Sequence, residues 1–113
     1  MPNDYDNIAI VVDWLDACRS GNVDALLDLY AADAGLQSVH EGVAVGGRAQ
    51  LAAYWAARLA TPSAGAFVLE QIMPVADGVV LDHADAAGRL VRTTFSFAHD
   101  GRISHSRSEP LPP

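Results

Sequence analysis

The hydrophobic pattern of the first half of the chain has the period of helices. Apolar residues in the segment 5–19 recur every three or four positions, at Ile8, Val11, Val12, Leu15 and Cys18. This spacing gives one apolar stripe and predicts a helix from about Tyr5 to Arg19. Gly21 is suited to end that helix, and Asn22 to cap a second, short helix from Val23 to Tyr30. A third helix is expected from about Arg48 to Leu59, with an inner face made by Leu51, Ala52, Trp55 and Leu59.

From residue 67 onward, apolar and polar residues alternate, which is the period of strands. The alternating segments are Phe67–Val75, Val79–Ala84, Arg89–Ala98 and Arg102–Glu109. Asp77-Gly78 and Asp100-Gly101 stand at two of the junctions, and Asp-Gly is a strong signal for a hairpin turn. The four segments therefore predict an antiparallel meander. An earlier strand, from Leu36 to Glu41, and a short extended piece, from Val43 to Val45, are expected before the third helix.

Helices followed by a meander of strands are typical of an α+β fold. We expect residues 1–113 to form one domain, in which three helices pack on a strongly curved, mainly antiparallel sheet in the order α-α-β-α-β-β-β-β. A chain of 113 residues is long enough to bury one core without a metal or a disulfide. Helices packed against a curved sheet leave a concavity of the kind that usually binds ligands.

Charge and composition narrow the expected partners. The net charge is -7, so the chain repels phosphate backbones and anionic headgroups, and neither nucleic acid nor a membrane is an expected partner. Cys18 is the only cysteine, which rules out an intrachain disulfide and favours a reducing compartment. The acidic segment 1–6 lacks the basic-then-apolar order of a secretory signal. The expected location is the cytoplasm.

Three sequence patterns occur in order along nearly the whole chain. They are Gly21–Ala34, read as GNVDALLDLYAADA; Gly47-Arg48 followed by Tyr54-Trp55; and Asp100–Ile103, read as DGRI. They resemble the signatures G-(D/N)-x-D-A-L-x-x-L-(Y/F)-A-x-D-A, G-(R/K)…Y-W and D-G-(R/K)-I of the nuclear transport factor 2-like superfamily, which includes SnoaL-like and ketosteroid isomerase-like proteins. The resemblance implies a cone-shaped α+β fold with a pocket. It leaves function open, because the superfamily includes isomerases, cyclases, dehydratases, epoxide hydrolases and non-enzymatic binding or dimerising domains.

The resemblance also implies where the residues of a ketosteroid isomerase would lie. The general base of those enzymes is an aspartate five residues after the one that corresponds to Asp33, and that position is Ser38 here. The tyrosine and the protonated aspartate of their oxyanion hole correspond to Trp14 and Thr93. A serine cannot remove a carbon-bound proton without its own base, and indole and threonine are weaker hydrogen-bond donors. We therefore expect no ketosteroid isomerase activity.

His40 is the candidate for acid–base chemistry. Alternation along the expected strand places it with Leu36 and Ser38 on the inner face, near the mouth of the pocket. A histidine titrates near neutrality and is suited to act as an acid or a base. The alternative is a half-exposed polar residue at the end of a strand, because no carboxylate stands at a matched position to orient its ring.

A ligand in this pocket is expected to meet mainly aromatic and small polar side chains. The predicted ligand-binding residues are Trp14, Tyr30, Ser38, His40, Trp55, Phe67, Thr93, Phe95 and Phe97. The alternative is that the aromatic residues fill the cone. No metal or cofactor is expected, because the adjacent Asp82 and His83 point to opposite faces of a strand, and His83 with Asp85 supplies only two ligands.

Three functions remain as hypotheses. The first is binding of a small, largely apolar molecule, without ketosteroid isomerase activity. The second is an isomerase, dehydratase or cyclase that uses His40 as acid or base, with Ser38 or Tyr30 as helper. The third is a dimeric interaction module with a filled cone. A homodimer is expected through the outer face of the late strands, the face that carries Thr94, Ser96, His105 and Arg107 if the phenylalanines face the pocket.

Overall fold

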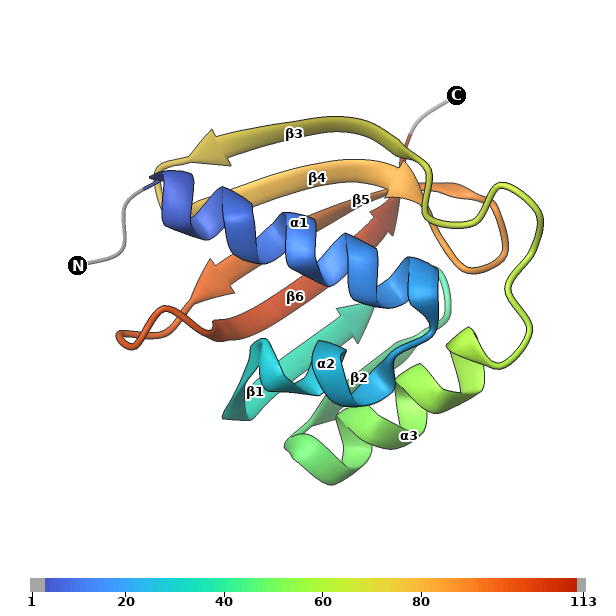
Figure 1. Cartoon of the computed structure of the whole chain (residues 1–113), viewed down its shortest axis with the longest axis horizontal. Helices are drawn as coiled ribbons and strands as arrows, with labels where there is room; N and C mark the ends of the chain where they lie inside the picture. Colours follow the sequence, from blue (N-terminus) through green and yellow to red (C-terminus); the bar gives the residue numbers. More distant parts are fainter. Residues whose placement is uncertain (1–3, 112–113) are drawn as a thin grey trace.

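Three helices and six strands follow one another in residues 4–111, the part of the chain that this computed structural model describes, with side chains described from Asp6 onward (Figure 1). The helices are α1 (Asp4–Ser20), α2 (Val23–Asp28) and α3 (Arg48–Leu59). The strands are β1 (Tyr30–Ser38), β2 (Val43–Gly46), β3 (Leu69–Val75), β4 (Gly78–Ala84), β5 (Leu90–Phe97) and β6 (Ile103–Pro110). The α+β fold and its element order are those predicted, with the short extended piece forming the strand β2.

Helix α2 begins as predicted and ends earlier. The Asn22 side chain accepts a hydrogen bond from the Ala25 backbone N–H at 3.1 Å, which caps the first turn. The helix ends at Asp28 and not at Tyr30. Tyr30 instead opens β1, because its side chain is buried in the core and its backbone pairs with Ile103 of β6.

The predicted bounds of the first strand were wrong at both ends. Strand β1 starts at Tyr30, and Gly35 lies within it, beside an irregularity in the pairing with β6. The strand stops at Ser38, where residues 39–42 form a turn closed by a hydrogen bond from the Gly42 N–H to the Val39 carbonyl. Gly42 has φ of 68°, the left-handed conformation that glycine adopts easily. His40 therefore lies in a turn between β1 and β2, and alternation along a strand does not position it.

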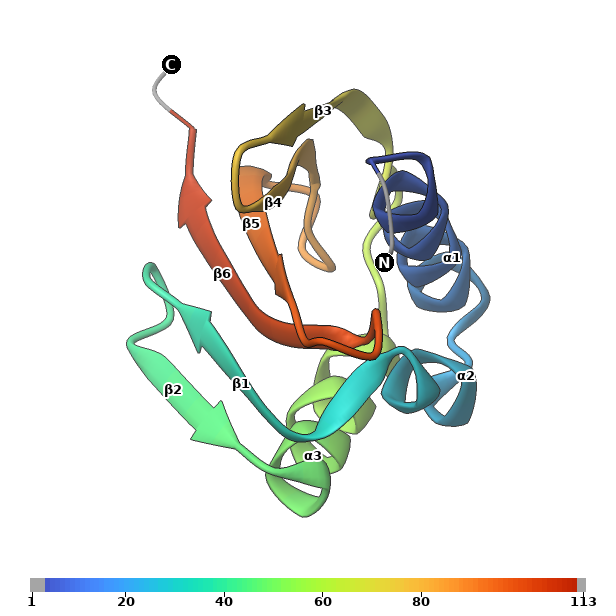
Figure 2. The same ribbon diagram turned by 90° about the vertical axis from the view of Figure 1, so that its left-hand side faces the viewer.

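The six strands form one sheet in the order β2-β1-β6-β5-β4-β3. Strands β3 to β6 form the predicted antiparallel meander, and β1 joins it through a parallel pairing with β6. Seen from the side, β6 bends strongly, and the helices lie on the concave side of the sheet (Figure 2). Helix α1 packs against β3 and β4, and α3 packs against β1 and β2, so the two helices cover opposite halves of the sheet.

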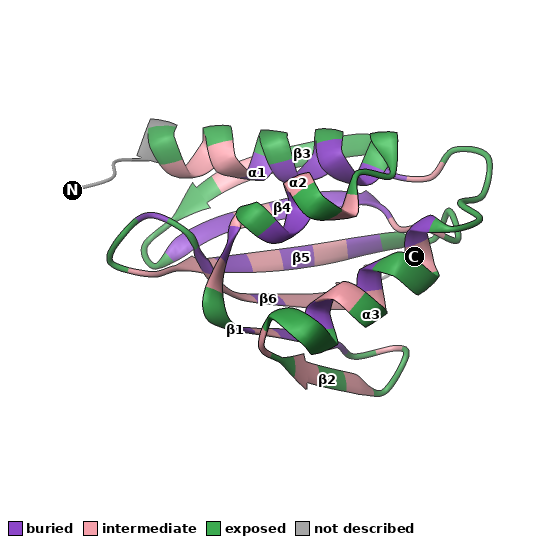
Figure 3. Ribbon diagram, turned by 60° about the horizontal axis from the view of Figure 1, so that its bottom comes forward, coloured by how far each residue is buried: buried purple, intermediate pink, exposed green. Residues whose placement is uncertain are grey.

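The core lies between the helices and the concave face. Figure 3 shows buried residues on the helix faces that turn toward the sheet and along its central strands. In β5 the alternation is clear: Val91, Thr93 and Phe95 are fully buried, whereas Arg92 and Thr94 are partly exposed. The side chains of successive residues point to opposite faces, so the second pair lies on the outer, convex face.

Polar cross-strand pairs cover the outer face. Arg92 donates two hydrogen bonds to the Asp82 carboxylate, at 2.8 and 2.9 Å, and these bonds hold the pKa of Asp82 below its ordinary value. Thr94 lies opposite Arg107, and Ser96 lies opposite His105. The outer face therefore contains Thr94, Ser96, His105 and Arg107, the polar residues that the alternating pattern predicted on it.

No helix among residues 4–111 is long and apolar enough to cross a membrane. The start of the acidic segment 1–6, residues 1–3, lies outside the described residues. The cytoplasmic location stays a prediction.

Pairing of this outer face with a second copy is a testable prediction. We expect light scattering at micromolar concentration to give the mass of a homodimer, and Thr94→Arg to weaken that dimer. The substituted arginine would lie opposite Arg107 and bring like charges together at the contact. Thr94→Ser, which adds no charge, should leave the dimer intact, and both variants should keep the wild-type circular dichroism. A monomer mass for the wild-type chain contradicts the prediction.

Candidate functional site

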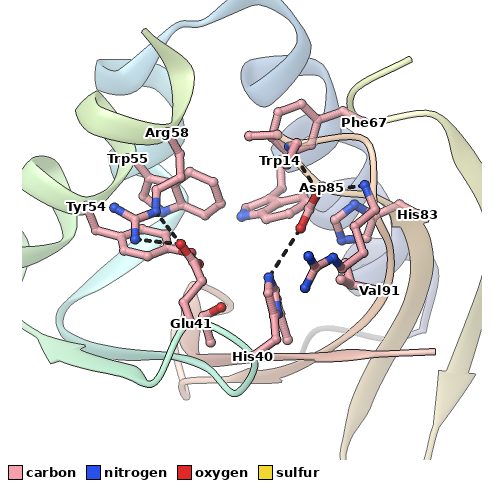
Figure 4. A pocket seen from close by; sticks show the side chains of 15 residues that line it. Trp14, His40, Glu41, Tyr54, Trp55, Arg58, Phe67, His83, Asp85 and Val91 are labelled. Carbon is pink, nitrogen blue, oxygen red and sulfur yellow. Dashed lines mark hydrogen bonds and ion pairs between the residues drawn. The ribbon is translucent and has the colours of Figure 1, made fainter. Parts of the chain in front are cut away.

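A pocket of about 250 Å³ opens between the N-terminal helix, α3, the β1–β2 turn and the β4–β5 turn (Figure 4). Its apolar wall consists of Trp14, Trp55, Phe67, Ala86, Ala87 and Val91. Its polar lining consists of Ser38, His40, Glu41, Tyr54, Arg58, His83, Asp85, Arg89 and Ser108. The polar residues come from four separate stretches of the chain, 38–41, 54–58, 83–89 and 108, so only the folded structure brings them together.

Five of the nine residues expected to bind a ligand line this pocket, namely Trp14, Ser38, His40, Trp55 and Phe67. The other four do not line it. Phe95 is fully buried behind Trp14, with ring centroids 5.0 Å apart, and Phe97 packs against the core. Thr93 lies one layer deeper, hydrogen-bonded to two residues of the lining. Contact of any of these residues with a ligand stays a prediction.

Tyr30 is the fourth of these residues, and it belongs to the core. Its hydroxyl accepts a hydrogen bond from the Trp14 indole N–H at 3.1 Å and lies 2.9 Å from the Ser106 hydroxyl. Burial raises the pKa of Tyr30 to about 12, so the phenol stays protonated at neutral pH. Both the Tyr30 hydroxyl and the Trp14 indole N–H are thus hydrogen-bonded inside the fold.

A carboxylate orients the His40 ring, contrary to expectation. His40 Nε2 lies 3.3 Å from Asp85 Oδ2, and both side chains are largely buried (Figure 4). The other oxygen, Asp85 Oδ1, accepts backbone hydrogen bonds from Ala87 and Arg89, both at 2.9 Å. The β4–β5 turn therefore fixes the carboxylate, and the carboxylate in turn fixes the imidazole.

The second nitrogen of His40 has a different environment. Nδ1 is buried and has no hydrogen-bond partner among the described residues. The Asp85 carboxylate, 3.3 Å from Nε2, favours the neutral form of the ring that carries its proton on Nε2 and its lone pair on Nδ1. This is the orientation in which an aspartate holds a histidine ready to accept a proton.

Glu41, Tyr54 and Arg58 form a second polar group at the mouth of the pocket. The Glu41 carboxylate accepts a hydrogen bond from the Tyr54 hydroxyl at 2.7 Å and two from Arg58, at 2.9 and 2.6 Å. Burial alone would raise the pKa of Glu41, but Tyr54, the nearby Ser38 hydroxyl and Arg58 together outweigh it and hold the pKa below its ordinary value. Arg58 also lies 4.0 Å above the Tyr54 ring, a cation–π contact. The charges of this group are satisfied within the protein.

A chain of hydrogen bonds runs inward from the pocket through Ser108, Thr93 and His83. The Ser108 and Thr93 hydroxyls lie 2.8 Å apart, and Thr93 Oγ1 lies 2.8 Å from His83 Nε2. His83 Nδ1 lies 2.8 Å from the Ala84 carbonyl, which can only accept, so Nδ1 carries the proton. Burial lowers the pKa of His83, so the ring is neutral at pH 7. Thr93 then donates to His83, and Ser108 donates to Thr93.

The residues that the sequence analysis missed had only weak local signals. Asp85 begins a turn that was recognised, but nothing in the sequence links it to His40, which lies 45 positions earlier. Tyr54 belongs to the Y-W pattern. The sequence analysis predicted Trp55 of this pattern in the pocket but assigned no role to Tyr54. No three histidine, cysteine, aspartate or glutamate side chains within the described residues are grouped so that they could hold a metal ion. Asp82 and His83 lie on opposite faces of β4, as their adjacency predicted.

Comparisons with known proteins identify the family and the structural relatives of this chain. The model of a family described as SnoaL-like domain matches residues 11–106. A search of the curated proteins finds no match. Among solved structures, a SnoaL-like protein of unknown function from Burkholderia thailandensis is similar with a TM-score of 0.82 and 21% identity, covering 99% of this chain and 100% of that one.

Two further structural relatives are connected with a reaction or a ligand. SalBIII, an epoxide hydrolase/cyclase-like enzyme of pyran ring formation in salinomycin, has a TM-score of 0.69 and 16% identity, over 96% of this chain and 92% of that one. A Mycobacterium tuberculosis protein solved in complex with estradiol-17beta-hemisuccinate has a TM-score of 0.71 and 14% identity, over 94% of each chain. At these identities the likeness shows a common fold.

The buried, neutral His83 generates a prediction about stability and pH. The unfolded chain takes up a proton on this histidine near pH 6.5, whereas the folded chain does so only at lower pH. Protonation of the unfolded state thus lowers the free energy of unfolding as the pH falls below about 6.5, by up to about 1.4 kcal/mol per pH unit. We expect urea denaturation at pH 7.5, 6.5 and 5.5 to show this loss, and His83→Gln to reduce it.

His99 supplies the matched control for this experiment, because it is an exposed histidine in the β5–β6 turn. His99→Gln should keep the wild-type dependence on pH. Equal dependence in the wild-type protein and in His83→Gln would contradict the prediction.

Proposed function

The chain belongs to the SnoaL-like domain family, and we propose that its pocket binds a small molecule with an apolar body and one hydrogen-bonding end, without ketosteroid isomerase activity. The observation that carries this proposal is a set of buried polar atoms without partners. Ser38 Oγ, His40 Nδ1 and Trp55 Nε1 all belong to side chains that line the pocket, and none of them has a hydrogen-bond partner among the described residues. Buried polar groups are nearly always hydrogen-bonded, so three such atoms in one lining favour a ligand that supplies the missing bonds.

The shape of the pocket supports a ligand of limited size. Its volume of about 250 Å³ is slightly below the roughly 300–1,000 Å³ of sites for drug-sized molecules. The indoles of Trp14 and Trp55 meet edge to face, with centroids 5.6 Å apart, and Phe67 lies on the other side of Trp14. A substituted bicyclic ring matches both the volume and the aromatic wall.

The polar end of the ligand is defined by what these three atoms can do. The Ser38 hydroxyl and the Trp55 indole N–H can donate, and the His40 Nδ1 lone pair accepts. A hydroxyl group on the ligand suits this set, because it accepts from a donor such as Ser38 and donates to His40. Glu41 and Arg58 already satisfy each other, so they are not the preferred partners of the ligand.

Three positions argue against ketosteroid isomerase activity. Ser38 has no hydrogen-bonded base to activate it. Trp14 donates its indole N–H to Tyr30, and the Thr93 hydroxyl is engaged in the layer behind the pocket. The three positions that carry the base and both donors of such an enzyme therefore lack those functions, and we expect no isomerisation of a Δ5-3-ketosteroid in a spectrophotometric assay.

The hypothesis of a filled cone is less favoured. A cavity of about 250 Å³ remains beside Trp14 and Trp55, which were the residues expected to fill it. Phe95, the third of them, packs behind Trp14 in the core. The chain therefore retains room for a ligand even with the aromatic residues in place.

Binding can be tested with 2-naphthol, and with 2-methoxynaphthalene as the analogue that cannot donate a hydrogen bond. We expect 2-naphthol to raise the melting temperature, because it binds only the folded state, and the methyl ether to raise it less. His40→Ala and Ser38→Ala should each weaken 2-naphthol binding by about 1 kcal/mol, roughly fivefold in Kd by calorimetry. The control variant is Ser104→Ala, whose side chain does not line the pocket.

Ser38→Ala also separates a binding role from a structural role. Because Ser38 Oγ has no partner in the free protein, its removal should leave the melting temperature without ligand unchanged or higher. A variant that loses affinity while keeping its stability supports the proposal. Failure of both naphthalene probes to bind, or equal affinity of the wild-type protein and the two pocket variants, contradicts it.

A further inference from the structure

We propose that His40, held by Asp85, is the general base of this pocket and removes a proton from carbon in a bound molecule. This inference rests on the proposed binding function and assigns a reaction class to the same site. The base lies on the β1–β2 turn, two residues after Ser38, the position that corresponds to the base of ketosteroid isomerases. Asp85 is the positioning residue, and the reacting atom is His40 Nδ1.

The first part of the argument is the orientation of the imidazole. Asp85 Oδ2 lies 3.3 Å from His40 Nε2, and the other carboxylate oxygen is held by the backbone N–H groups of Ala87 and Arg89. The carboxylate thus cannot turn away without breaking two hydrogen bonds of its own turn. Its charge favours the neutral ring with the proton on Nε2 and the lone pair on Nδ1, the arrangement that a general base requires.

The second part is the surroundings of Nδ1. This nitrogen is buried and unpartnered, and its side chain lines a pocket whose opposite wall is made by Trp14, Trp55 and Phe67. A structural histidine in a core normally uses both ring nitrogens, as His83 does in this protein with Thr93 and Ala84. His40 has one nitrogen beside a carboxylate, whereas the other is buried without a hydrogen-bond partner among the described residues.

The third part is the stabilisation of the negative charge that proton removal creates. The Ser38 hydroxyl in the same lining is a donor without a partner. Six arginines of the chain lie within 4.0 Å of a carboxylate: Arg19, Arg48, Arg58, Arg92, Arg102 and Arg107. Arg89 lines the pocket, and within residues 4–111 it has no such carboxylate partner. The pocket therefore combines a base with a neutral donor and a guanidinium group that is within 4.0 Å of no carboxylate in the described residues.

The probe 5-nitrobenzisoxazole tests this inference directly, because it is a bicyclic carbon acid and needs no cofactor. His40 Nδ1 takes the proton from C3, the electron pair of that C–H bond becomes part of the new nitrile, and the N–O bond breaks. The oxygen leaves as a phenolate, and the imidazolium returns its proton to the solvent. The coloured 2-cyano-4-nitrophenolate product is followed by absorbance.

We expect the wild-type protein to accelerate this elimination with saturation by the probe. His40→Ala should lower kcat/KM by about 100-fold or more, the usual contribution of a general base. His105→Ala should keep the wild-type rate, because His105 lies on the outer face of the sheet opposite Ser96. Should the alanine variant fail to fold by circular dichroism, His40→Gln supplies the same test with a side chain of similar size.

Asp85→Asn tests the positioning role separately. The asparagine oxygen can keep the two backbone hydrogen bonds of the turn, while its amide group donates to His40 Nε2 and moves the ring proton to Nδ1. We expect kcat to fall at least tenfold with KM unchanged. In ¹⁵N NMR at about pH 8, where an ordinary imidazole is neutral, the His40 proton should reside on Nε2 in the wild-type protein and on Nδ1 in the variant.

The outcomes separate this inference from the proposed function. If the probe binds, as shown by competition with 2-naphthol, but wild-type and His40→Ala eliminate it at the same rate, the base assignment is wrong and ligand binding stands. A wild-type His40 with its proton on Nδ1 also overturns the assignment. If neither 5-nitrobenzisoxazole nor 2-naphthol binds, the binding function itself fails, and the base assignment fails with it.

Discussion

The Trp14 indole packs between the helices and the sheet, and the shape of the pocket depends on this packing. From α1 this side chain meets Trp55 of α3, His83 of β4 and Phe95 of β5 edge to face, with ring centroids 5.0 to 5.6 Å apart. Its N–H donates to Tyr30 of β1. One buried residue therefore sets the distance between helices and sheet on both halves of the fold. Because edge-to-face rings cannot close flat against each other, they hold the helices apart and leave one indole edge as the pocket wall.

The polar groups around Trp14 are of two kinds: some are hydrogen-bonded to one another, and others have no hydrogen-bond partner within residues 4–111. The Ser108–Thr93–His83 chain and the Glu41–Tyr54–Arg58 group satisfy themselves, and they make the surroundings of the pocket rigid. Ser38 Oγ, His40 Nδ1 and Trp55 Nε1 have no hydrogen-bond partner among the described residues, and their side chains line the pocket. This contrast is informative, because three of the four buried side-chain atoms without a partner in the described part of the chain belong to this one lining.

Local signals predicted most of the fold, and distant contacts account for what they missed. The Asn22 cap, the helical stripes and the Asp-Gly turns act over a few residues, so the helices and the meander could be predicted from them. The parallel pairing of β1 with β6 could not, and it is what turns Tyr30 from a helical residue into a strand residue. The same reason hid the partner of His40: Asp85 is brought to it only when the β1–β2 and β4–β5 turns meet over the pocket. The family resemblance supplied the general location of the pocket, but not the polar contacts in it.

The hydrogen-bond chain that ends at the Ala84 carbonyl has a consequence for selectivity. Because that carbonyl can only accept, every proton in the chain points inward, from Ser108 through Thr93 to His83 and on to the backbone. The Ser108 oxygen consequently offers lone pairs, and no hydrogen, to the space it lines. An alcohol beside Ser108 finds an acceptor there, whereas a ketone of the same outline meets lone pairs facing lone pairs. For the binding function proposed above, the Ala84 carbonyl would thus make the pocket prefer an alcohol to the corresponding ketone, although the carbonyl itself makes no contact with the ligand.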